Sequence, residues 1–117
     1  MELTYHWEGD VLIPDLELED GSNYQIGKYG RMRQRYLFEN HHAMYTHLVL
    51  TEKLWKHLEE VDMECNDMMD MLTVRMAERE GVTEHLKSVD QFGWVRKMNN
   101  IRSRAEEVVL HDLIYMD

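Results

Sequence analysis

The stretch TEKLWKHLEEVDMECNDMMDMLTVRMAEREGVT, residues Thr51 to Thr83, decides the fold of this 117-residue chain. Thr51 is a natural helix N-cap, and Gly81 can adopt the positive φ that is typical of a residue ending a helix. Apolar residues recur between them at spacings of three and four, which places them on one face of a helix. They are Leu54, Leu58, Val61, Cys65, Met68, Leu72 and Met76. The pattern predicts one core helix of about 30 residues.

A second helical arm follows after a short connection. Thr83 is placed to cap it, so the two arms are expected to form an antiparallel helical hairpin. Its apolar residues, at mostly helical spacing, are Leu86, Val89, Trp94, Met98, Ile101, Ala105, Val108 and Val109. Gly93 and the capping-box pattern Ser88-x-x-Gln91 predict a kink or a restart of the helix near residue 90.

A shorter helix is expected from Lys28. Tyr29, Met32, Tyr36 and Leu37 recur with a helical period and form its apolar face. A second face gathers Lys28, Arg31 and Arg35, whereas Arg33 lies off both faces. Asn40 and Thr46 are alternative positions for the break that follows.

The residues before this helix have another pattern. LTYHWEGDVLI, residues 3–13, alternates aromatic and β-branched residues around Glu8-Gly9-Asp10, which predicts a short hairpin ending at Pro14. An extended, acidic and turn-rich segment then continues to residue 26. We therefore predict a mainly α fold of three to four helices, including the long antiparallel hairpin, with a small N-terminal β-hairpin. One domain is expected over 1–117, with the hairpin and acidic segment at 1–26 and the helices at 27–117.

Composition limits the class of protein. Hydrophobic residues make up 44% of the chain and charged residues 31%, as in folded globular proteins. No apolar run approaches the roughly 18 residues that span a bilayer, and the start of the chain lacks a basic leader and a cleavage site. A single cysteine cannot form an internal disulfide, which agrees with a reducing compartment. The expected location is the cytoplasm, with no membrane contact.

The residues offer no constellation for catalysis. Cys65 sits on the apolar stripe, where a thiol is usually inert, and no serine lies in a G-x-S-x-G turn. The GKYG sequence lacks the spacing of a phosphate-binding loop. His41 and His42 point about 100° apart on a helix, and no paired metal-binding motif accompanies them. We expect no catalytic residue, no metal site and no cofactor.

Two basic windows interrupt a chain whose net charge is −10. Residues 27–36 and 94–104 each carry four bases and no acid. Such rows can contact phosphates or base edges, although they are also typical of a solvated helix face whose charges neighbouring acids neutralise. The candidate nucleic-acid-binding residues are Lys28, Arg31, Arg33, Arg35, Arg96, Lys97, Asn100 and Arg104. They would form one patch if the fold brings the two windows together.

Four motifs carry a resemblance to a known family. GDVLIPDL (Gly9 to Leu16), IGKYGRMR (Ile26 to Arg33), REGVTEHLK (Arg79 to Lys87) and WVRKMNNIRSRAEE (Trp94 to Glu107) resemble, in this order, the transposon-encoded protein TnpV family. The resemblance implies a bacterial protein carried on conjugative or mobilisable transposons, with an excisionase-like accessory role and no assigned enzymatic activity.

Three hypotheses of function stay open. In the first, the protein is a non-enzymatic accessory of a mobile element that binds DNA or the recombination and excision machinery. In the second, residues 1–26 and the outer face of the long helix present carboxylates to a basic cleft, as an inhibitor or DNA mimic directed at a nuclease, a recombinase or a host defence protein. In the third, the protein is a helical structural protein that self-associates as a homodimer.

Overall fold

The computed structural model describes residues 4–15 and 23–116. Two strands, β1 (Thr4–Glu8) and β2 (Val11–Asp15), precede the helices. The helices are α1 (Lys28–Asn40), α2 (His42–Leu50), α3 (Leu54–Arg79), α4 (Glu84–Val89) and α5 (Gln91–Val109), and the π-helical segment η1 (Leu110–Ile114) continues α5. The mainly helical character that the sequence predicts is confirmed.

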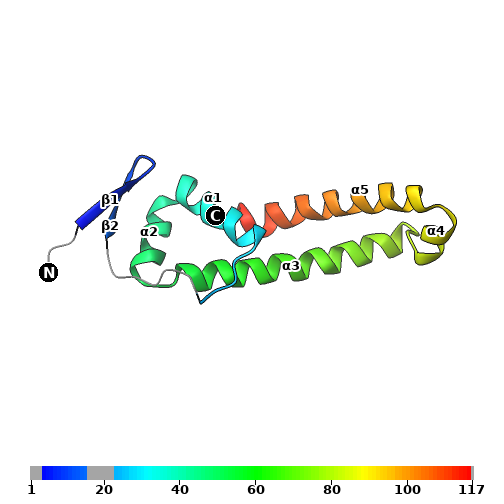
Figure 1. The fold of residues 1–117 in the computed structure, drawn as a ribbon, viewed down its shortest axis with the longest axis horizontal. Coiled ribbons are helices and arrows are strands. Elements are labelled where there is room, and N and C mark those ends of the chain that lie inside the picture. The colour runs from blue at the N-terminus through cyan, green and yellow to red at the C-terminus, as the bar shows by residue number, and fades with distance from the viewer. Residues whose placement is uncertain (1–3, 16–22, 117) are drawn as a thin grey trace.

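The two longest helices, α3 and α5, run antiparallel side by side, and α3 continues past the end of α5 toward α2 (Figure 1). The short helix α4 closes one end of this pair, and α1, α2 and η1 gather at the other end (Figure 1). The molecule measures 68 × 26 × 20 Å and is therefore an elongated rod. We call residues 71–104, which hold the α4 end of the rod, the distal half, and the rest of the helical body the proximal half.

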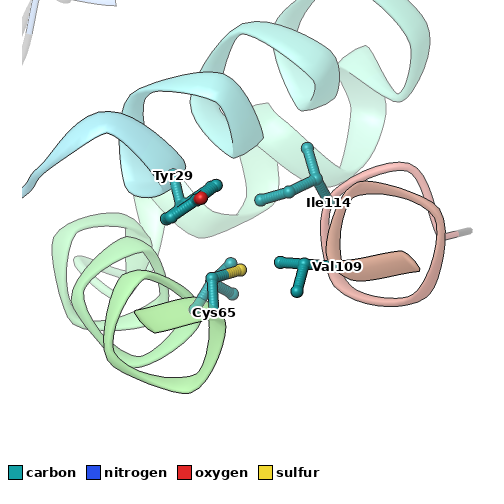
Figure 2. Close-up of a cluster of buried hydrophobic side chains, with 5 residues drawn as sticks. Tyr29, Cys65, Val109 and Ile114 are labelled. Carbon is teal, nitrogen blue, oxygen red and sulfur yellow. The ribbon is translucent and has the colours of Figure 1, made fainter. Parts of the chain in front are cut away.

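Three hydrophobic clusters of the described residues hold the helices together. Leu37 of α1, Tyr45 of α2 and Leu58 of α3 belong to the first. The second joins Tyr29, Cys65, Val109 and Ile114, whose side chains meet between α1, α3 and the C-terminal end of the chain (Figure 2). The third lies in the distal half and is built on Val82, Met98 and Ile101. Burial of these side chains is the main favourable term in folding.

The predicted fold class requires a correction. The described residues form five α-helices and a π-helical segment, so three to four helices is wrong. The strands pair antiparallel from Thr4↔Asp15 to Glu8↔Val11, with Gly9 at φ 63° in the turn. The ribbon lies to one side of the helices (Figure 1), and its turn approaches α1 next to Phe38. The body is thus wholly helical, and most of the predicted acidic segment, residues 16–22, lies outside the described residues.

The helix boundaries also differ from the predicted ones. Thr51 does not start α3; its hydroxyl donates to the His47 carbonyl at 2.8 Å and closes α2 instead. Glu52 follows in the left-handed region at φ 57°, which turns the chain into α3. The break after α1 falls at His41, directly after Asn40. Asp90 starts α5, accepting a hydrogen bond from the Gly93 backbone at 3.0 Å, because an aspartate side chain can satisfy a free N–H of the first turn.

Candidate nucleic-acid interface

The first basic window begins with a close contact between α1 and α3. A Cβ on Gly30 would lie 3.0 Å from the Leu58 carbonyl oxygen and 2.5 Å from Ile26 Cγ2. The buried Asp62 carboxylate accepts a hydrogen bond from the Gly30 backbone at 2.9 Å. Asp62 therefore caps α1 from another helix and places negative charge at its positive end. Sequence reasoning missed this contact, although two glycines three residues apart at a helix start were a signal for it.

Arg33, in the middle of this window, is only 3% exposed. One guanidinium nitrogen donates to the Ile114 carbonyl at 2.6 Å and to the Met116 carbonyl at 2.8 Å. Its Nε donates to His57 Nε2 at 3.4 Å. Arg33 thus holds the C-terminal end of the chain against α1, and nucleic acid cannot reach it without unfolding this region.

His57 gives the proximal half a pH dependence. Burial, and then the charge of Arg33, lowers the pKa of His57, while Glu60 and Glu64 oppose this shift. The unfolded chain therefore binds a proton more readily than the folded protein, so stability is full above about pH 6.5 and is lost as the pH falls through the folded pKa. We expect the urea midpoint to fall less between pH 7.5 and pH 5.5 in His57→Gln than in the unsubstituted protein. Equal falls in both would contradict this role.

The other bases of the first window are exposed, and two of them face acids. Lys28 Nζ lies 2.8 Å from Glu106 on α5, and this hydrogen bond raises the pKa of Lys28. Arg35 Nε lies 3.0 Å from Glu39 on the same helix. Such exposed pairs contribute at most about 1 kcal/mol each. Arg31 Nε donates to the Gly27 carbonyl at 3.3 Å and stays exposed. The side chains of Lys28, Arg31 and Arg35 therefore contact other groups of the same chain.

The second window lies on α5 in the distal half. One terminal guanidinium nitrogen of Arg104 donates to both carboxylate oxygens of Glu80 at 2.8 Å, and its Nε donates to Asn100 Oδ1 at 2.8 Å. Arg96 and Lys97 are exposed and make no ion pair with any described residue. A shallow hollow of about 350 Å³ is lined by Glu80, Asp90, Gly93, Arg96, Lys97 and Asn100. Two cations and an amide are therefore exposed beside two carboxylates, of which Glu80 is held by Arg104 and Asp90 by the Gly93 backbone.

The fold does not bring the two windows together. Glu106 on α5 faces Lys28 of α1, so this side of α5 carries α1. Arg104 precedes Glu106 by two residues, which is about 200° around the helix. Arg104 and Asn100, its hydrogen-bond partner one turn away, therefore point to the other side of the α3–α5 pair. The eight candidate residues form no common patch.

Charge is also divided along the rod. Residues 71–104 carry seven bases and four acids, a net charge of +3, whereas the rest of the chain carries six bases and nineteen acids. Beyond the second window, the distal bases are Arg75, Arg79 and Lys87, whose ammonium group lies 4.6 Å from the centre of the Trp94 ring. Counting charges within short windows missed this division, because α3 and α5 bring distant segments side by side (Figure 1).

Comparison with known proteins gives the context. Residues 4–114 match the model of a family described as transposon-encoded protein TnpV. The chain belongs to the TnpV family. The resemblance carried by its four motifs is thereby confirmed, and the protein is associated with mobile elements. No curated protein and no solved structure matches this TnpV protein.

The remaining reactive side chains of this TnpV protein are enclosed or dispersed. Cys65 is fully buried, and burial raises the pKa of its thiol to about 11. His41 lies against Tyr36 and His42 against Phe38. Residues 4–15 and 23–116 contain no cluster of three or more histidine, cysteine, aspartate or glutamate side chains that could hold a metal ion. None of the helices described combines the length and apolar character needed to cross a membrane.

Proposed function

We propose that this TnpV protein is a non-enzymatic accessory of a transposon that binds DNA through the outer side of α5 in the distal half. The observation that carries the proposal is the exposure of Arg96, Lys97 and Asn100 in a net-positive half of the rod, with no ion pair to Arg96 or Lys97 among the described residues. Guanidinium and ammonium groups bind phosphates, and an amide can read base edges.

The acidic net charge of the whole chain does not oppose this interface. Charges in water are screened over about 8 Å at physiological salt. The rod is 68 Å long, and most of the acids lie outside the distal half. A phosphate at Lys97 would therefore sense the distal bases more strongly than the acids at the other end.

The proposed interface is smaller than the eight residues that the sequence suggests. Arg33 is buried, Lys28 pairs with Glu106 on the other side of α5, and Arg35 pairs with Glu39 within α1. The contacts proposed here are Arg96, Lys97 and Asn100, with Arg104 at the edge because Glu80 already holds its guanidinium. The first window keeps an architectural role in this proposal.

Salt dependence tests the proposal. If Arg96 and Lys97 each contact a phosphate, the affinity for a 20-base-pair duplex should fall about 12-fold between 50 and 200 mM salt. The double variant Arg96→Gln/Lys97→Gln should lower the slope of log K against log salt by about 1.8, because two phosphate contacts are lost. Fluorescence anisotropy of a labelled duplex measures both quantities.

The matched control is Lys53→Gln/Lys56→Gln. It removes the same charge from exposed positions at the proximal end of α3. The control should keep the slope of the unsubstituted protein. Equal weakening by both double variants, or no binding at 50 mM salt, would show that the distal half is not a DNA-binding surface.

A further inference from the structure

Phe92, in the first turn of α5, is 85% exposed, an unusual state for a phenylalanine in a folded protein. Its orientation is fixed by its neighbours. Gly93 is buried against the Asp90 carboxylate, which occupies the space that a Cβ would need. Trp94 packs inward on the third cluster, beneath Lys87. The helix cannot rotate to bury Phe92 without expelling Trp94 and breaking the Asp90 cap.

Phe92 is the first member of an exposed stripe. Arg96 and Asn99 follow at i+4 and i+7, which places the three side chains on one face of α5. Along the helix axis, Phe92 and Arg96 are separated by about 6 Å, and Arg96 and Asn99 by about 4.5 Å. The stripe therefore presents an aromatic ring, a guanidinium group and an amide in a row on the outer side of the rod.

We infer that Phe92 stacks on a base of unpaired DNA while Arg96 contacts the adjoining phosphate. The inference rests on the proposed function and names its ligand as single-stranded DNA. Bases inside a duplex are already stacked on one another, whereas an unpaired base offers a free face to an aromatic side chain.

Charge selects this ligand over an apolar protein surface. Arg96 lies one turn from Phe92 on the same face of α5, and the nearby carboxylate of Asp90 is engaged by the Gly93 backbone. A polyanion that carries aromatic groups can stack on the Phe92 ring and bind the basic side chains at the same time. An apolar protein surface placed on Phe92 would leave Arg96 desolvated and without a partner, which is unfavourable.

The test uses a labelled 20-nucleotide single strand of mixed sequence at 50 mM salt. Phe92→Leu keeps an apolar side chain and removes the aromatic face, and should weaken binding about 5- to 150-fold, as the loss of one stacked base does. Phe92→Trp should restore binding. Val89→Ala, which removes an exposed apolar group from α4 outside the stripe, should leave binding unchanged. Because Phe92 is so exposed, the thermal midpoint of each Phe92 variant should match that of the unsubstituted protein.

The result separates the inference from the proposed function. Unchanged binding of the single strand by Phe92→Leu, with weaker binding by Arg96→Gln/Lys97→Gln, would overturn the stacking and leave DNA binding in place. Absence of binding to both the duplex and the single strand at 50 mM salt would overturn the proposed function itself. A protein partner lost in Phe92→Leu, with single-strand binding retained, would also overturn the inference.

Discussion

Arg33→Met should lower the free energy of unfolding by about 2–5 kcal/mol. Methionine keeps the length and the apolar stem of the side chain but donates no hydrogen bond. The carbonyls of Ile114 and Met116, which Arg33 reaches at 2.6 and 2.8 Å, then lose this donor. Hydrogen bonds from a charged group contribute about 1.5–3 kcal/mol each, and of these two carbonyls only that of Ile114 is buried. The C-terminal segment should therefore detach from α1 at lower denaturant than in the unsubstituted protein.

Urea unfolding followed by circular dichroism measures this effect, with Arg31→Met as the matched control. Arg31 lies two residues away in the same helix, is exposed, and donates to a carbonyl of its own helix start. Its replacement should change stability by less than about 0.5 kcal/mol. If both variants unfold at the same urea concentration, the hydrogen bonds of buried Arg33 do not stabilise the protein more than those of exposed Arg31.

Gly30→Val should destabilise the protein by about 3 kcal/mol, and Gly30→Ala by about 1–2 kcal/mol. The Cβ of either residue meets the Leu58 carbonyl, which belongs to the backbone of α3 and cannot move aside as a side chain can. The helix α1 must then shift away from α3 and stretch the hydrogen bond from Gly30 to Asp62. Alanine also gains about 1 kcal/mol of helix propensity over glycine, which makes its net effect smaller.

A comparison with Ser103→Val isolates the steric cause. Ser103 lies in the interior of α5 and is exposed, so valine changes little there beyond its small helix propensity difference. Urea titrations should show the highest free energy of unfolding for Ser103→Val, a lower value for Gly30→Ala and the lowest for Gly30→Val. A stability of Gly30→Ala above that of the unsubstituted protein would mean that α1 and α3 do not approach so closely.

The long helical pair could be predicted because its signal repeats. Seven apolar residues from Leu54 to Met76 recur with one period, and a pattern of that length leaves few alternatives. The ends of individual helices were less predictable, since a single polar side chain can cap either the helix before it or the helix after it. Thr51 illustrates this: its hydroxyl bonds back to His47 and closes α2, although its position before an apolar stripe equally suits an N-cap.

The candidate site was harder to predict than the fold. Arg33 has the same charge as Arg31 and Arg35, and its burial depends on a segment 81 residues away that folds back on α1. Asp62 likewise looks like one of many acids on α3 until α1 is placed over it. Exposure of Arg96 and Lys97 followed more directly from sequence, because their places on the amphipathic helix α5 are opposite its apolar stripe.

The capping of α1 by Asp62 also constrains the order in which the chain becomes structured. Its acceptor is synthesised 32 residues after its donor, and the Leu58 backbone against which Gly30 packs also follows later. A nascent chain that ends before α3 therefore holds the sequence of α1 without its cap and without its docking surface. An isolated helix of 13 residues is marginal in water, where helices shorter than about 12–15 residues rarely persist. During synthesis, α1 should become stable only when α3 has emerged to receive it.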